Sequence, residues 1–287
     1  NANGNIHEYL NVLKIVKTIR EYAKKWAKQN KFCDFWYGNN HATKLEKVSK
    51  KLAIPYNIPK GNLKGLLVGV FELTSKPQVM ETFINGVKMA YHSLKNVGIP
   101  EDTIVTLPDI VSNEWSTKEN ILFHLKRLLS GNDNKFFYFT GRRQRIKEQS
   151  INTRGYFFDC QGNSILDQEL FSIFKHSDFT GHLTIVVDYC KSGTLSKLKP
   201  GDFQQFKVII YFSCEENQVP MASSRKAILI GAFSWELFNA LYKNPQLSIS
   251  QLIDNIELAK STKRFPYNQD FVINANYNYD LDEKIWK

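Results

Sequence analysis

Five short apolar runs, separated by amphipathic stretches, constrain the fold of this 287-residue chain more than any other feature. They cover residues 65–73, 103–107, 135–140, 183–188 and 207–212. Short runs that are apolar on both faces are typical of buried strands in a parallel sheet. Apolar residues recur with a helical period over residues 78–97, 117–130, 166–177, 228–243 and 248–260. The alternation predicts an α/β fold, a three-layer α/β/α sandwich with about six mainly parallel strands.

Local signals refine this prediction at two places. Ser116 and Glu119 have the spacing of a capping box at the start of the helix predicted over residues 117–130. Residues 156–166, with a Gly162-Asn163 turn, predict a hairpin or a loop rather than a helix. In open parallel sheets the functional site lies at the carboxyl ends of the strands, which points to residues 140–143 and 188–193.

Positive charge is concentrated at the start of the chain. Residues 1–60 hold twelve Lys/Arg and four acids, a net +8 out of the formal +10 of the whole chain. One stripe of a helix over about residues 6–30 is apolar, and it consists of Val12, Val16, Ile19, Ala23 and Trp26. We therefore expect a basic helical arm over residues 1–60, packed through this stripe on a domain of residues 61–287. Its lysines either form a solvent-exposed helix face or bind nucleic acid or another acidic surface weakly.

Several classes of protein are excluded by composition. No apolar run reaches the eighteen residues of a membrane span, and the first thirty residues lack the apolar core of a signal peptide. The four cysteines form no CxxC pair, which argues against a zinc ribbon or a disulfide framework. The expectation is a soluble, cytoplasmic protein in a reducing compartment.

Two predicted strand ends carry the most informative motifs, FFYFTGRRQ (136–144) and LTIVVDYCKSGTL (183–195). About fifty residues apart and in this order, they resemble the metacaspases of the caspase-like cysteine peptidases. Supporting pieces follow in the order of that family over about residues 63–280, and they include KGLLVGV, GIPEDTIVTLPD, SCEENQ and GAFSWELFNAL. The resemblance implies a caspase fold with a catalytic cysteine and a catalytic histidine at neighbouring strand ends.

The resemblance places Cys190 at the nucleophile position but Arg142, between Gly141 and Arg143, where the histidine stands in the family. A cysteine peptidase needs a base that takes a proton from the thiol and returns it to the leaving amine. Arginine keeps its proton at physiological pH, so Arg142 can attract a thiolate but cannot alternate between a neutral and a protonated form. Of the other histidines, His182 opens the Cys190 strand, about 26 Å away at its far end.

The substrate pocket that the resemblance implies is also altered. Asp188 stands at the position of the acid that binds a basic side chain, and Thr140 replaces a serine. Phe83 and Gly86 stand where the family has a cysteine and a second pocket aspartate. The calcium site of many metacaspases is depleted in the same way, because Gln168 replaces an acid between Asp167 and Glu169, and Lys197 stands near another. No metal and no other cofactor is expected.

Three functions remain open at this point. The first is a metacaspase-like pseudopeptidase that serves as an interaction or regulatory module for a protein or peptide partner, without enzymatic activity. The second is an active cysteine endopeptidase with altered specificity or a base supplied from elsewhere. The third is a nucleic-acid or phosphate binder that uses the basic arm with Arg142, Arg143 and Arg145. If the first is right, the double change Gly86→Asp with Arg142→His is expected to restore measurable turnover.

Overall fold

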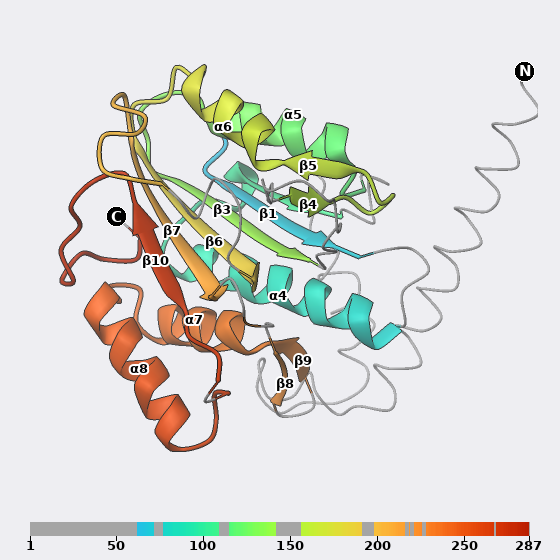
Figure 1. Ribbon diagram of the computed structural model, residues 1–287, viewed down its shortest axis with the longest axis vertical. Coiled ribbons are helices and arrows are strands. Elements are labelled where there is room, and N and C mark those ends of the chain that lie inside the picture. The colour runs from blue at the N-terminus through green and yellow to red at the C-terminus, as the bar shows by residue number, and fades with distance from the viewer. Residues whose placement is uncertain are drawn as a thin grey trace, which may run out of the picture. The chain divides into compact units, whose positions relative to one another are not determined.

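Six strands form one sheet in the order β10-β7-β6-β3-β1-β2 in the computed structural model (Figure 1). All neighbours pair in parallel except β10, which runs antiparallel to β7 at the edge. The strands are β1 (Gly65–Val70), β2 (Ile104–Leu107), β3 (Lys135–Gly141), β6 (His182–Cys190), β7 (Lys207–Cys214) and β10 (Val272–Ala275). The predicted sheet of about six mainly parallel strands is therefore confirmed.

The structure describes residues 62–71, 77–108, 115–141, 156–190, 198–215, 218, 221–225, 228–266 and 268–286. Only the backbone, and not the side chain, is described for residues 77–80, 156–158, 167, 189–190, 222–225 and 228. The basic arm over residues 1–60 and its apolar stripe lie outside the described residues. The division of the chain at residue 60 therefore stays a prediction. No helix within the described ranges is long and apolar enough to cross a membrane.

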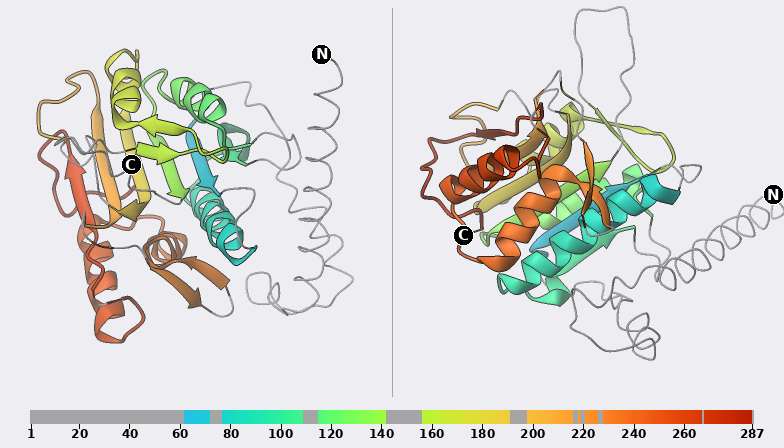
Figure 2. Two further views of the ribbon diagram at one scale, coloured as in Figure 1. Left: turned by 45° about the vertical axis from the view of Figure 1, so that its right-hand side comes forward. Right: turned by 90° about the horizontal axis from the view of Figure 1, so that it is seen from below.

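Helices cover both faces of the sheet, as a three-layer α/β/α arrangement requires (Figures 1 and 2). Helices α5 and α6 lie on one face, and α4 and α7 lie on the other, where α8 packs against α7. Their bounds are α4 (Pro77–Asn96), α5 (Lys118–Leu128), α6 (Asp167–Lys175), α7 (Ala232–Lys243) and α8 (Ile249–Ser261), and a short 3-10 helix covers Glu101–Thr103.

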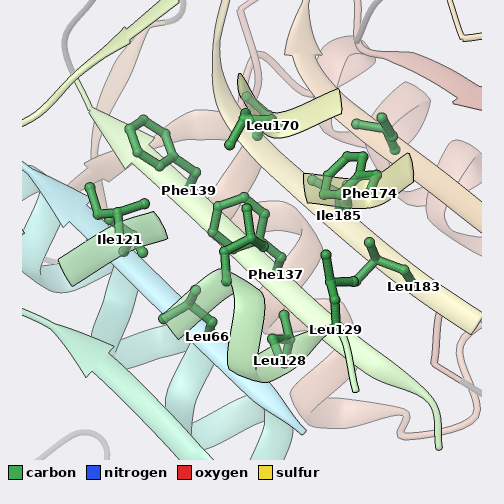
Figure 3. Packing of buried hydrophobic residues seen from close by; sticks show 14 of the residues in the cluster. Leu66, Ile121, Leu128, Leu129, Phe137, Phe139, Leu170, Phe174, Leu183 and Ile185 are labelled. Atoms are coloured by element: carbon green, nitrogen blue, oxygen red, sulfur yellow. The ribbon is translucent and has the colours of Figure 1, made fainter. Parts of the chain in front are cut away.

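Alternation along the strands divides the core between these two layers. Leu66, Phe137 and Ile185 belong to one buried cluster, together with Ile121 of α5 and Phe174 of α6 (Figure 3). The intervening residues of β3 face the opposite layer. The rings of Phe136 and Tyr138 lie 6.4 Å and 5.0 Å from the ring of Phe238 on α7.

Two small hairpins flank the sheet. Strands β4 (Tyr156–Phe158) and β5 (Ser164–Leu166) form the hairpin predicted over residues 156–166, and Gly162 takes a positive φ of 86° in its turn. Strands β8 (Ala222–Arg225) and β9 (Ile228–Gly231) form a second hairpin. The helix predicted over residues 228–243 is therefore wrong over its first four residues, because α7 begins only at Ala232.

The predicted capping box at Ser116 is also wrong. Thr117 is the N-cap of α5, and its side chain accepts a hydrogen bond from the backbone N–H of Asn120. The Ser116 hydroxyl is buried and donates to the carbonyl oxygen of Gly69 over 2.8 Å. This serine therefore joins the start of α5 to strand β1 instead of capping the helix.

Candidate functional site

The carboxyl ends of β3 and β6 lie side by side, because the two strands pair in parallel with Thr140 opposite Asp188. Gly141 is the last residue of β3 and Cys190 the last of β6, so the two predicted motifs meet at one edge of the sheet. The backbone of Cys190 pairs with Cys214 of β7 after a register shift. The Cys190 side chain, Arg142 and Arg143 lie outside the description.

Asp188, the predicted pocket acid, is buried with 5% of its surface exposed. Its carboxylate accepts hydrogen bonds from the hydroxyl and the backbone N–H of Ser234 and from the hydroxyl of Ser213. Burial raises the pKa of Asp188, while these hydrogen bonds act in the opposite direction. A carboxylate buried in this way is stable only because hydrogen-bond donors surround it.

The backbone bond from Ser234 gives Asp188 a structural role at the start of helix α7. Ser234 lies in the first turn of this helix, where backbone N–H groups have no partner within the helix. The N-cap residue is Gly231, which has no side chain to supply one. A Cβ atom on Gly231 would lie only 1.9 Å from Asp188 Oδ2. Asp188 therefore caps α7 from a neighbouring strand, and glycine is the residue that makes room for it.

Tyr138 extends the hydrogen bonds of Asp188 toward helix α4. Its hydroxyl lies 2.8 Å from the Ser234 hydroxyl and is fully buried. Because the proton of the Ser234 hydroxyl goes to Asp188, Tyr138 is the donor to Ser234. The order is therefore Tyr138 to Ser234 to Asp188. Burial, followed by the charge of Asp188, raises the pKa of Tyr138 above its ordinary value, so this hydroxyl stays protonated.

Gly86 faces Tyr138 from helix α4. A Cβ atom at Gly86 would lie 2.4 Å from the Tyr138 hydroxyl oxygen and 3.5 Å from Thr140 Cγ2. The space of a side chain at residue 86 is thus already filled by Tyr138. Phe83 lies one turn earlier, where its carbonyl oxygen approaches β1, 3.2 Å from the position of a Cβ on Gly69.

The structure thus brings Asp188, Thr140 and Gly86 together around Tyr138. Sequence reasoning missed Tyr138, Ser234, Ser213 and Gly231. One signal was available for Tyr138, since it stands two residues before Thr140 on the same strand and must share its face. No local signal relates Ser234 or Ser213 to Asp188, because both approach from distant parts of the chain.

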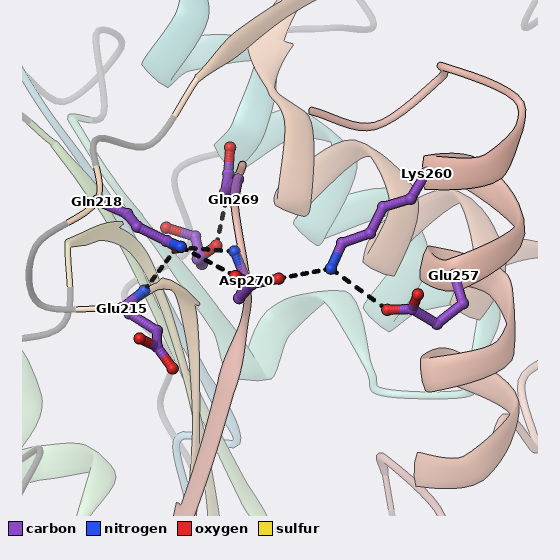
Figure 4. Close-up of polar contacts among 7 residues, drawn as sticks. Glu215, Gln218, Glu257, Lys260, Gln269 and Asp270 are labelled. Carbon is purple, nitrogen blue, oxygen red and sulfur yellow. Dashed lines mark hydrogen bonds and ion pairs between the residues drawn. The ribbon is translucent and has the colours of Figure 1, made fainter. Parts of the chain in front are cut away.

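The end of β7 beside this site is held by a polar cluster (Figure 4). Gln218 and Asp270 exchange two hydrogen bonds, and Lys260 of α8 lies 2.7 Å from Asp270 and 3.3 Å from Glu257. The buried Gln269 donates to the carbonyl oxygen of Ser213 over 2.8 Å and accepts from the backbone N–H of Met221. These contacts fix the strand end that presents Ser213 to Asp188.

Glu169 belongs to the region predicted to have lost a calcium site, and its carboxylate is engaged by protein groups, whereas the side chain of Asp167 is not described. Both carboxylate oxygens of Glu169 lie within 2.9 Å of the Lys118 ammonium, which also donates to the Ser164 carbonyl oxygen. Burial alone would raise the pKa of Glu169, but Lys118 and the N–H of Leu166 lower it overall. Over the described residues, no three His, Cys, Asp or Glu side chains lie together as a metal site would need.

The four described histidines occupy other parts of the fold. His182 starts β6 at the edge opposite Cys190, and its Nε2 lies 2.8 Å from the Tyr277 hydroxyl. His176 is the C-cap of α6, and His92 and His124 belong to α4 and α5. His124 is buried in its helix. His7 and His41 lie outside the described residues.

Comparison with known proteins agrees with the motifs and with the sheet. Residues 63–199 match the family described as metacaspase, peptidase C14 domain. Metacaspase-1 of Botryotinia fuckeliana is 25% identical over 74% of this chain and 68% of its own length. Metacaspase-1A of Aspergillus oryzae is 25% identical over 75% and 68%, and Metacaspase-1 of Ajellomyces capsulatus is 23% identical over 79% and 83%.

A solved structure supports the fold independently. The crystal structure of protein GSU0716 from Geobacter sulfurreducens is similar with a TM-score of 0.52 over 77% of this chain and 95% of that protein. At 13% identity, this likeness concerns the fold alone. The motifs at two adjacent strand ends, the match of residues 63–199 and the relatives agree, and together they support a metacaspase, caspase-like family for this chain.

Proposed function

We propose that this chain is a metacaspase-like pseudopeptidase that acts as an interaction or regulatory module. The observation that carries the proposal is the residue that follows β3. This strand ends at Gly141 beside the end of β6, and the next residue is Arg142, where the family has its catalytic histidine. A guanidinium can favour a thiolate by its charge, but it keeps its protons at neutral pH, so it can neither take the thiol proton nor protonate the leaving amine. Acylation needs a general base that later acts as a general acid, and Arg142 can serve as neither.

The surroundings of Asp188 support the same proposal. In a peptidase that cleaves after a basic residue, this carboxylate must meet the substrate cation. Here it caps helix α7 and accepts hydrogen bonds from Ser234 and Ser213. A second carboxylate at residue 86 is absent from the sequence. Neither Asp188 nor residue 86 therefore offers a free carboxylate that would hold a basic substrate residue for cleavage.

Peptidase assays test the proposal directly. The full chain should release no product from Arg- or Lys-containing peptides, with or without calcium. Arg142→His should increase the rate at which iodoacetamide modifies Cys190 at neutral pH, because an imidazole can take the thiol proton, and we expect this gain to exceed the loss of the guanidinium charge. This variant should gain thiol reactivity before it gains turnover. Product formation by the unmodified chain, abolished by Cys190→Ala, would establish the active endopeptidase instead.

Cys160 provides an internal control for the labelling experiment. Burial, followed by the charge of Asp159, raises the pKa of the Cys160 thiol to about 11. At pH 7 only about one molecule in 10,000 carries the thiolate. Peptide mapping should therefore find no modification at Cys160 in the folded protein, with or without Arg142→His.

A further inference from the structure

Tyr138 occupies the space between helices α4 and α7 beside Asp188. Its hydroxyl contacts Ser234 on one side, and on the other it leaves no room for a Cβ atom at Gly86. Its ring meets the Phe238 ring edge to face, with centroids 5.0 Å apart. A tyrosine fixed by a hydrogen bond, an aromatic contact and a helix backbone cannot swing away without disturbing all three.

The position of the Tyr138 side chain matters because the carboxylate of Asp188 lies next to it, beyond Ser234. A buried carboxylate near the end of a strand is an attractive site for a cation, and Asp188 is 5% exposed. Its hydrogen bonds come from Ser234 and Ser213, and Ser234 is in turn held by Tyr138. An arginine or lysine side chain that paired with Asp188 Oδ2 would need to displace the Ser234 hydroxyl, which Tyr138 holds in place.

We propose that Tyr138 is a specificity-determining residue that closes the cation pocket at Asp188 from within the fold. This arrangement requires glycine at residue 86, because the tyrosine hydroxyl fills the space that a side chain there would need. A peptide partner that binds at this edge therefore contributes no basic side chain to Asp188. This inference rests on the proposed function, because it describes which peptides the inactive site accepts.

Benzamidine is a suitable probe, since it combines an aromatic ring of the size of the tyrosine ring with a cationic amidinium. Thermal unfolding of the full chain is measured with benzamidine and with neutral benzamide. The wild type should show no shift in Tm with either compound. Tyr138→Ala opens the pocket and should bind benzamidine at least about tenfold more tightly than benzamide. Adding Asp188→Asn to this variant should remove the preference for the cation.

Two results would overturn the proposal. One is saturable binding of benzamidine by the wild type that Asp188→Asn abolishes, because the pocket would then be open. The other is equal binding of benzamidine and benzamide by Tyr138→Ala, because Asp188 would then not face the vacated space. Should Tyr138→Ala fail to fold, the pair Gly86→Ala and Tyr138→Phe decides the question. Gly86→Ala should lower Tm in the wild type and not in Tyr138→Phe, and an equal loss in both would refute the closure.

These outcomes are independent of the proposed function. Peptidase activity toward neutral peptides would refute the pseudopeptidase but leave the closure by Tyr138 intact. Binding of benzamidine by the wild type would refute the closure but leave the replacement of histidine by Arg142 untouched.

Discussion

The contact between Gly86 and Tyr138 predicts that Gly86→Ala destabilises the wild type but stabilises the variant Tyr138→Phe. Gly86→Ala places a methyl group 2.4 Å from the Tyr138 hydroxyl oxygen, about 1 Å closer than an ordinary contact. Tyr138 is fully buried and cannot yield, so we expect an overpacking cost of about 1–3 kcal/mol. Alanine is favoured over glycine inside a helix by about 1 kcal/mol. The net effect on the free energy of unfolding is a loss of about 0–2 kcal/mol.

Removing the hydroxyl changes this balance. In Tyr138→Phe, the nearest atoms to the new methyl group are the ring Cζ at 3.4 Å and Thr140 Cγ2 at 3.5 Å, both at ordinary contact distance. Only the helix preference then remains, and Gly86→Ala should stabilise this variant by about 1 kcal/mol. The expected coupling between the two positions is therefore about 1–3 kcal/mol. Tyr138→Phe alone should cost about 1 kcal/mol, through the lost hydrogen bond to Ser234.

Urea unfolding of the four proteins in the cycle measures this coupling. Tyr211→Phe provides a matched control, since Tyr138, Val186 and Tyr211 are opposite one another on β3, β6 and β7. Tyr211 is fully buried, but it lies two strands from Tyr138. Gly86→Ala should be additive with Tyr211→Phe. A coupling below about 0.5 kcal/mol with Tyr138→Phe would show that the hydroxyl does not fill the space at residue 86.

Two further predictions concern the stability of the domain. The buried Tyr211 hydroxyl has no hydrogen-bond partner among the described residues, so Tyr211→Phe should raise the free energy of unfolding by about 1 kcal/mol, and a loss in urea unfolding would contradict this. Lys118→Met removes the ammonium that joins Glu169 to the Ser164 carbonyl and should cost about 1–2 kcal/mol at pH 7. Because the folded-state pKa of Glu169 is lowered, its contribution is present above about pH 4.3 and is lost as the pH falls through the lowered value. Lys118→Met should therefore weaken the acid dependence of unfolding, and an unchanged dependence would show that the ion pair does not stabilise the fold.

The double change Gly86→Asp with Arg142→His, expected from the sequence to restore turnover, does not fit this structure. Any side chain at residue 86 meets the Tyr138 hydroxyl before it reaches a substrate. The resemblance to metacaspases implies that an acid is absent at residue 86, and the structure adds that Tyr138 fills this space. A restored pocket needs Tyr138→Phe in addition, and the two-residue change without it should destabilise the protein. Turnover by the two-residue variant at full stability would contradict the geometry around Tyr138.

The sheet could be predicted because its central strands are apolar along their whole length and are separated by helical stretches. The elements that were misread lie at its margins. Ile228–Gly231 is a four-residue apolar run, and such a run continues a helix pattern as readily as it forms a strand. Val272–Ala275 is an edge strand whose first three residues are only half buried, so its pattern is weak. Short, partly exposed segments carry too little periodicity to be assigned without their partners.

The candidate site also contains residues that the sequence could place and one whose role it could not predict. Asp188, Thr140 and Cys190 could be placed because each stands in a motif at the end of a predicted strand. The role of Tyr138 could not, because it depends on Gly86, 52 residues earlier, and on Ser234, 96 residues later. Such contacts depend on the packing of α4 and α7 on the sheet, which no local pattern in the sequence specifies.

The position of Asp188 has a structural explanation that involves no substrate. The resemblance to metacaspases implies that a carboxylate here binds the substrate. Asp188, however, supplies the cap that Gly231 cannot give to helix α7, and it fills the space left by that glycine. Replacing it would leave a backbone N–H of Ser234 and the hydroxyl of Ser213 without their acceptor in a buried environment. The presence of this acid is therefore weak evidence for peptidase activity, because the fold needs the carboxylate whether or not a substrate ever meets it.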